Sequence, residues 1–106
     1  MIAIIETRHF KQYVLESGHP VLVDFWASWC ENCRAQLLIL DDIAEDLGRS
    51  ARIGKVNIDS ESSLAYLFQI RAVPTLLLFK NGKIVQRFQG FTRKQDLIDA
   101  LNKHII

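Results

Sequence analysis

The sequence predicts an α/β fold in which a central mixed β-sheet is flanked by helices. Apolar runs of strand length alternate with segments whose apolar residues recur at helical spacing, a pattern typical of parallel strands joined by helices. Near the C-terminus, Asn81-Gly82 favours an antiparallel hairpin, because both residues tolerate the positive φ of a tight turn. The 106 residues match one domain spanning 1–106 with the element order βαβαβαββα.

The N-terminal half predicts two strands and two helices. A short strand at residues 2–5 precedes a helix over 7–17. Residues 20–27 are too continuously apolar for a half-solvated strand, and they indicate a central strand buried on both faces. A long helix then begins near Cys33 and ends at Gly48, and its expected apolar stripe comprises Leu37, Leu40, Ala44 and Leu47.

The C-terminal half predicts three strands and two helices. Residues 52–59 form a strand, and a short helix over 61–69 follows, with an apolar face of Leu64, Leu67 and Phe68. Strands 75–80 and 83–89 pair across the hairpin turn. A capping box at Thr92 and Gln95 precedes the last helix, whose buried face comprises Leu97, Ile98, Leu101 and Ile105.

The composition argues against several classes of function. Thirteen Lys and Arg balance 12 Asp and Glu to a net charge of +1 without a basic stripe, so we expect no nucleic-acid partner. No apolar run approaches the roughly 18 residues of a membrane span. The start of the chain lacks the features of a signal peptide. We therefore expect a cytoplasmic protein with no membrane partner.

Cys30 and Cys33 enclose Glu31-Asn32 where the buried strand ends and the long helix begins. Free N–H groups and the helix dipole favour an anion there, so Cys30 should have thiolate character. Because Cys30 precedes the helix and can be exposed, it is the candidate nucleophile. Cys33 lies near enough to resolve a mixed disulfide formed at Cys30. The position therefore favours a redox pair.

Two other interpretations of the cysteines remain open at this point. They are structural thiols, or they are half of a tetrahedral zinc site. A bridge between positions three apart closes almost no loop and adds little stability. Zinc normally needs four protein ligands, and the histidines lie on distant segments without ligand-like spacing: His9, His19 and His104.

Asp24 is a carboxylate inside the otherwise apolar run 20–27. Burial would disfavour its charged form and raise its pKa, leaving a group able to exchange a proton near neutral pH. The alternative is an Asp at a frayed strand position with its carboxylate in water.

With these residues considered, the sequence resembles the thioredoxin family along nearly its full length. The matching stretches fall in the order and spacing of the family: residues 21–27, Trp29-Cys30 with Cys33, 55–59, 73–82 and Gly90. The resemblance implies the thioredoxin fold and a thiol-disulfide oxidoreductase that reduces protein disulfides without a bound cofactor. It also implies disulfide-containing protein substrates, an NADPH-linked thioredoxin reductase as electron donor, and a monomer.

The resemblance also implies roles for individual residues. Asp24 would assist deprotonation of Cys33, and Lys55 would be the neighbouring amine that modulates Asp24. A cis peptide bond would join Val73 to Pro74 beside the cysteines. A shallow apolar groove for the substrate backbone would be formed by Trp29, Val73, Pro74 and Gly90, extended by Ile58 and Phe91.

The sequence departs from the family at the two residues between the cysteines, where Gly-Pro is usual and Glu31-Asn32 stands here. The charge of Glu31 disfavours the thiolate and makes the couple more reducing, whereas Asn32 can donate a hydrogen bond to the same sulfur. An exposed charge is worth on the order of 1 kcal/mol, or roughly 20 mV, against about 150 mV between reducing and oxidising members. Leu38 replaces a helix-kinking proline, so we expect a straighter helix.

The favoured function is reduction of protein disulfides through Cys30 and Cys33. One alternative is an interaction module of the same fold in which redox turnover is incidental. A second is a specialised oxidase or isomerase, and a third is a metal scaffold that shares the cysteines of two chains.

Overall fold

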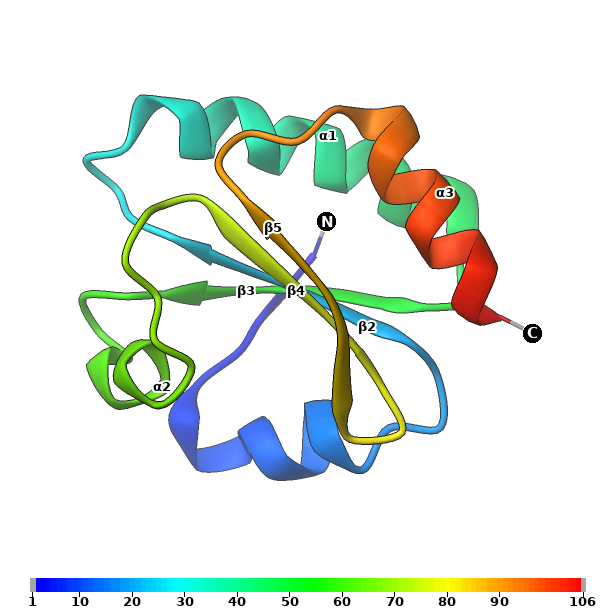
Figure 1. Ribbon diagram of the computed structural model, residues 1–106, viewed down its shortest axis with the longest axis horizontal. Coiled ribbons are helices and arrows are strands. Elements are labelled where there is room, and N and C mark those ends of the chain that lie inside the picture. Colours follow the sequence, from blue (N-terminus) through cyan, green and yellow to red (C-terminus); the bar gives the residue numbers. More distant parts are fainter. Residues whose placement is uncertain (1, 106) are drawn as a thin grey trace.

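The computed structural model describes residues 2–105, so the two ends of the predicted domain 1–106 lie outside the described residues. It contains a five-stranded mixed sheet with the order β1-β3-β2-β4-β5, as Figure 1 shows. The first three strands along this order are parallel, and the last two are antiparallel to their neighbours. The strands are β1 (Ala3–Ile4), β2 (Val21–Trp26), β3 (Arg52–Asn57), β4 (Thr75–Lys80) and β5 (Lys83–Gln89). The predicted fold class is confirmed.

Strand β2 lies between β3 and β4, in the middle of the sheet. Its first five residues are all buried, which matches the continuous apolar run of the sequence. In the register of the sheet, Asp24 lies beside Lys55 on β3 and Leu76 on β4. The chain leaves β2 directly toward the two cysteines.

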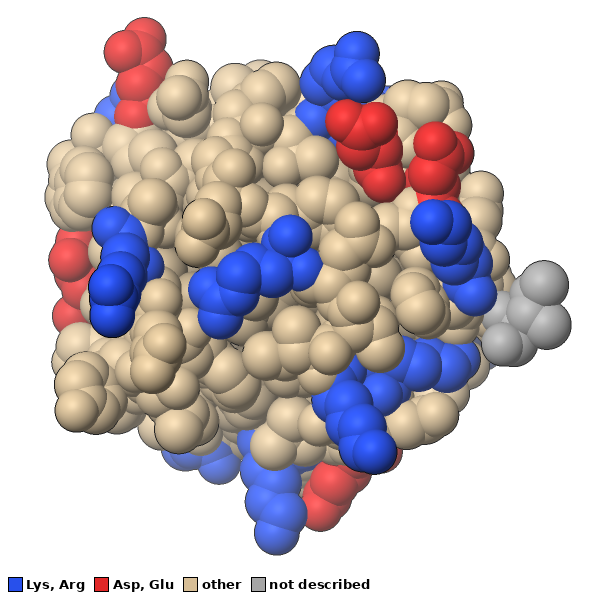
Figure 2. Space-filling view, viewed as in Figure 1, with Lys and Arg blue, Asp and Glu red and all other residues tan. Residues whose placement is uncertain are grey.

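The hairpin between β4 and β5 turns at Asn81-Gly82, as predicted. Both residues have positive φ, 52° and 78°, and Lys80 pairs with Lys83 across the turn. The register shifts between Leu78 and Phe79. Figure 2 looks onto this hairpin and shows basic side chains spaced apart among uncharged ones, without a continuous basic stripe on that face.

Helices cover both faces of the sheet (Figure 1). On one face, α1 (Glu31–Leu47) and α3 (Lys94–Ile105) enclose an aliphatic cluster that includes Leu22, Leu40, Leu78, Leu97 and Leu101. On the other face, η1 (Thr7–His9), η2 (Lys11–Leu15) and α2 (Ser62–Leu67) accompany a cluster that includes Phe10, Val14, Phe25, Leu64 and Phe79. Among the helices of residues 2–105, none is long and apolar enough to cross a membrane.

The predicted helix over 7–17 is present in place but is not one α-helix. It consists of a 3₁₀ turn followed by a π-type segment, in which the Glu16 N–H donates to the carbonyl of Lys11 at 3.0 Å. Apolar spacing reports which side chains are buried, and Phe10 and Val14 are indeed buried. It does not distinguish helices whose hydrogen bonds span three, four or five residues.

The predicted apolar face of α2 is partly wrong, because Leu67 is 66% exposed. Leu64 is buried and Phe68 is half-buried in the cluster on this side of the sheet, where the Phe68 ring lies 5.6 Å from that of Phe79. Residues four apart share a helical face more closely than residues three apart on a helix this short. Leu67 therefore points outward.

The predicted capping box at Thr92 and Gln95 is not formed. The Thr92 N–H donates to Oε1 of Gln36 at 2.8 Å, and Nε2 of Gln95 donates to Asp99 at 2.8 Å. Because Gln36 already takes the Thr92 N–H, that N–H is not available to the Gln95 side chain.

Candidate active site

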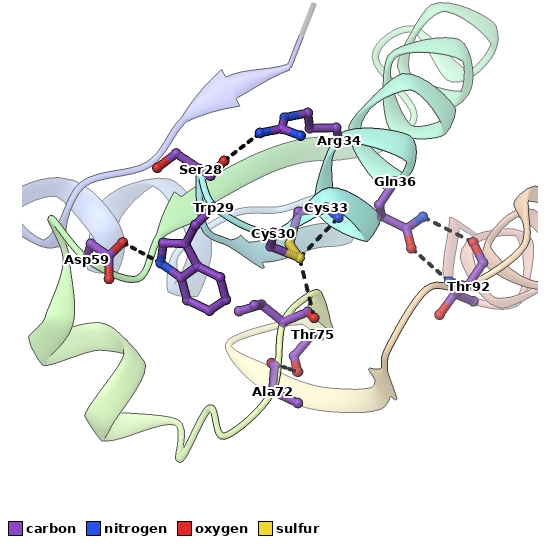
Figure 3. The surroundings of a disulfide bond; sticks show 11 residues. Ser28, Trp29, Cys30, Cys33, Arg34, Gln36, Asp59, Ala72, Thr75 and Thr92 are labelled. Carbon is purple, nitrogen blue, oxygen red and sulfur yellow. Dashed lines mark hydrogen bonds between the residues drawn. A yellow bond between two sulfur atoms is a disulfide. The ribbon is translucent and has the colours of Figure 1, made fainter.

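The two cysteines lie where β2 runs into α1, and they form a disulfide. Cys30 is the N-cap of α1 with extended φ and ψ of −98° and 113°, and Cys33 lies in the first turn, with 5.3 Å between the two Cα atoms. The Cys33 N–H donates to Sγ of Cys30 at 3.2 Å, as Figure 3 shows. One N–H group of the first helical turn therefore points at the first sulfur, an arrangement that stabilises a thiolate in the reduced form.

The two sulfurs differ in access. Cys30 is 8% exposed, whereas Cys33 is completely buried. Sγ of Cys30 also lies 3.6 Å from the carbonyl oxygen of Val73, to which a thiol at that position can donate. Cys30 is therefore the more accessible of the two sulfurs.

The loop before β4 lies beside the disulfide. The Val73-Pro74 peptide bond is cis, as the family resemblance implied. The hydroxyl of Thr75 donates to the carbonyl of Ala72 at 2.6 Å, and the N–H of Gly90 donates to the carbonyl of Pro74 at 2.8 Å. These two bonds fix the loop on both sides of the proline.

Trp29 and Gly90 border the same region. Trp29 is 66% exposed, and its Nε1 donates to the carboxylate of Asp59 at 3.1 Å, which holds the ring on the surface (Figure 3). Gly90 has φ +83°, a conformation that favours glycine, and the space where a Cβ would lie is open. Phe91 is 44% exposed, and Ile58 packs against the cysteines.

Asp24 is completely buried, and neither of its carboxylate oxygens has a hydrogen-bond partner among the described residues. Burial raises the pKa of Asp24 to about 7, and the positive charge of Lys55 opposes this rise. The prediction of a buried acid is confirmed, and the alternative of a frayed strand position is wrong. The carboxylate makes no direct hydrogen bond to Cys33.

Lys55 lies beside Asp24 in the register of β2 and β3. Its Nζ lies over the ring of Trp26, 5.2 Å from the ring centroid. The indole N–H of Trp26 is buried and, like the carboxylate of Asp24, has no partner in residues 2–105. The structure thus brings an acid, an amine and an aromatic ring together on one side of β2.

The zinc interpretation finds no further ligands near the cysteines. Within the part of the chain that the structure describes, no group of three or more His, Cys, Asp and Glu side chains is placed to hold a metal ion. The cysteines are instead bonded to each other.

Gln36 was missed by the sequence analysis. It is completely buried on α1, and its side chain bonds both the N–H and the carbonyl of Thr92 (Figure 3). The most buried positions of α1 are Cys33, Gln36, Leu40 and Ile43. Of the predicted stripe, Leu40 is therefore fully buried, whereas Leu37, Ala44 and Leu47 are partly buried against the same cluster. A polar residue at three- and four-residue spacing from Cys33 and Leu40 was the available signal.

Comparisons with known proteins agree with the geometry of the site. The family model named Thioredoxin matches residues 1–103. Thioredoxin 1 of Synechococcus elongatus is 43% identical over 97% of this chain and 96% of its own length. The thioredoxins of Buchnera aphidicola and Rickettsia felis are 45% and 43% identical, each over 91% of this chain and over 88% and 91% of their own lengths. The chain therefore belongs to the thioredoxin family, and it is a thiol-disulfide oxidoreductase whose redox-active disulfide joins Cys30 and Cys33.

Proposed function

We propose that this chain reduces disulfides of other proteins, with Cys30 as the attacking sulfur and Cys33 as the resolving one. The observation that carries this proposal is the asymmetry of the pair. Cys30 is 8% exposed at the N-terminus of α1, whereas Cys33 is completely buried in the first turn of the helix.

The reaction balances as two successive exchanges. The Cys30 thiolate attacks one sulfur of the substrate disulfide, and the other substrate sulfur leaves as a thiolate that takes up a proton. Cys33 loses its proton and attacks Sγ of Cys30, which releases the second substrate thiol. The substrate gains two electrons and two protons, and the enzyme is left with the Cys30–Cys33 disulfide.

Asp24 is the group that accepts the proton of Cys33, and Lys55 adjusts its acidity. Two observations support these roles. A pKa of about 7 leaves both forms of Asp24 populated near neutral pH, so the group can take up and release a proton there. Asp24 alternates along β2 with Val23 and Phe25 of the aromatic face, so it lies on the face covered by α1, the helix that carries Cys33.

Trp29, Val73, Pro74 and Gly90 form the surface on which the substrate lies. The carbonyl of Val73 is near the attacking sulfur, so an extended substrate segment can pair with this backbone. Open space above Gly90 lets a substrate backbone approach closely, and the exposed ring of Trp29 offers apolar contact.

Electrons return from an NADPH-linked thioredoxin reductase, and the chain acts as a cytoplasmic monomer without a bound cofactor, nucleic acid or membrane. The membership of the chain in the thioredoxin family supports each of these properties. A binding module with incidental redox activity, and an oxidase or isomerase, are the competing functions.

Insulin reduction tests the proposed function. The wild type should accelerate reduction of insulin by dithiothreitol, and Cys30→Ser should abolish the acceleration. Cys33→Ser should accumulate a mixed disulfide with the substrate through Cys30, which mass spectrometry detects. Equal rates for wild type and Cys30→Ser would favour the binding module instead. NADPH consumption with a purified thioredoxin reductase tests the electron source.

A further inference from the structure

We propose that Gln36 is a positioning residue for substrate binding, which fastens the segment 90–93 to the helix that carries Cys33. This inference rests on the proposed function, because it assumes that Gly90 and Phe91 border the substrate. It adds to that function a residue that touches neither the substrate nor the sulfurs.

The Gln36 amide makes two hydrogen bonds with one backbone unit. Its Nε2 donates to the Thr92 carbonyl at 3.1 Å, and its Oε1 accepts from the Thr92 N–H at 2.8 Å. Figure 3 shows the side chain extending from α1 to this segment. Because one donor and one acceptor act together, Thr92 is held in orientation as well as in distance, much as a backbone is held in a sheet.

The two hydrogen bonds between Gln36 and Thr92 are connected to the reactive sulfurs through helix α1. Cys33 and Gln36 lie three residues apart on α1, so they share one helix face about one turn apart. Both side chains are completely buried. A rigid helical turn therefore links the position of the resolving sulfur to the position of Thr92.

Two further hydrogen bonds connect Thr92 to the residues that border the groove. The Thr92 hydroxyl donates to the carbonyl of Gly90 at 3.1 Å. The Gly90 N–H in turn donates to the carbonyl of Pro74 at 2.8 Å. The connection thus runs from α1 through Thr92 and Gly90 to the proline loop, and it spans both sides of the surface beside Cys30.

The choice of a buried amide is explained better by positioning than by stability. A leucine would fill the same volume without the cost of burying polar atoms. The two hydrogen bonds of Gln36 mostly replace bonds that the same groups make with water in the unfolded chain. What leucine cannot supply is a fixed orientation of the 90–93 backbone.

Steady-state kinetics of Gln36→Leu with two substrates provide the test. Under the proposed function insulin lies across the groove, whereas hydroxyethyl disulfide is too small to occupy it up to segment 90–93. We expect KM for insulin to rise about fivefold with little change in kcat, while the rate with the small disulfide falls less than about twofold. Exchange of the Thr92 amide hydrogen, followed by NMR, should become faster. Gln95→Leu, which removes an exposed amide on α3, is the matched control. It should change neither the KM for insulin nor the exchange rate of the Thr92 amide hydrogen.

Gln36→Glu is a second test variant, in which protonation of the new carboxyl group should restore the two hydrogen bonds to Thr92. A protonated carboxyl can donate to the Thr92 carbonyl and accept from its N–H, as the amide does, whereas an ionised one cannot donate. Relative to wild type at the same pH, KM for insulin should therefore be raised at alkaline pH and should return toward wild type as the pH falls.

Three outcomes decide the proposal. An unchanged KM for insulin in Gln36→Leu overturns it. An equal loss with both substrates also overturns it, because that result indicates a merely structural role. A wild type that reduces hydroxyethyl disulfide but not insulin contradicts the proposed function itself, whatever Gln36 does.

Discussion

The two faces of the sheet are packed with different chemistry. The face that contacts η2 and α2 is mainly apolar, although Thr75 is also buried there, opposite Phe25. Each of its four phenylalanine rings has its centroid 5.4 to 6.1 Å from that of at least one other: Phe10, Phe25, Phe68 and Phe79. The face under α1 and α3 is aliphatic over most of its area. Toward the disulfide, however, it buries the carboxylate of Asp24 and the amide of Gln36.

The difference between the two faces indicates that the aromatic face mainly stabilises the fold, whereas the polar groups of the other face serve the reaction. Burial of aromatic rings stabilises the fold in proportion to the apolar area removed from water. Burial of a carboxylate without a hydrogen bond costs free energy, which the rest of the fold must offset. The carboxylate that carries this cost belongs to Asp24, on the strand that leads to the cysteines. A role in the reaction therefore explains the buried polar groups of this face better than a role in stability does.

Phe79→Ala should have the largest effect on the aromatic face. Loss of a buried ring should lower the free energy of unfolding by about 3 to 5 kcal/mol, because a cavity is left among Phe10, Phe68 and the sheet. Urea denaturation measures this loss. The rate with a small disulfide, per folded molecule, should stay near wild type.

Phe79→Leu is the milder control, in case the alanine variant does not fold. It should lose less stability and keep its redox rate. A redox rate that falls in step with stability in both variants would contradict the separation of the two faces.

Asp24→Asn should stabilise the protein in a pH-dependent way. The unfolded carboxyl ionises near pH 3.8, whereas the folded one stays protonated up to about 7, so the unfolded state binds fewer protons across this window. Stability of the wild type therefore falls as the pH rises from about 4 to 7, by on the order of 4 kcal/mol in all. Asparagine does not titrate, so the variant should gain most above pH 7 and little below pH 4.

Asp24→Asn should also slow disulfide exchange, since Cys33 loses its proton acceptor. Denaturation at several pH values gives the stability difference, and stopped-flow reduction of insulin gives the rate. A stability difference that is the same at every pH, or an unchanged rate across neutral pH, would remove the assigned role of Asp24.

Trp29→Ala should act on binding and hardly on stability. The ring is mostly exposed, so its removal should weaken binding of protein substrates about threefold to tenfold and change the free energy of unfolding by less than about 1 kcal/mol. Kinetics with insulin measure the first effect. Asp59→Asn keeps the ring and weakens only its hydrogen bond, so it should have a smaller effect than Trp29→Ala.

Glu31→Gln should have the smallest effect. Removing the exposed negative charge beside Cys30 favours the thiolate of the reduced form, so the reduction potential should rise by no more than about 20 mV. Equilibration with glutathione buffers measures the potential. A fall in potential would contradict the assigned sign of this charge.

Local rules predicted much of the molecule from sequence. The Asn81-Gly82 turn needs only residues that tolerate positive φ, and the junction of β2 with α1 needs only a buried run followed by a helical pattern. Gln36 could not be found in this way, because its partner Thr92 lies 56 residues away. The exposure of Leu67 likewise depends on which side of α2 meets the sheet, which the spacing left undecided.

The ionisation of Cys30 in the reduced protein tests the central claim most directly. The ultraviolet absorbance of the thiolate, followed against pH in wild type and in Cys30→Ser, isolates this sulfur. If the N-terminus of α1 prepares Cys30 for attack, the thiolate absorbance of Cys30 should appear with a pKa well below the value of about 8.5 for free cysteine. Development at or above that value would contradict the claim that this sulfur is held as a ready nucleophile.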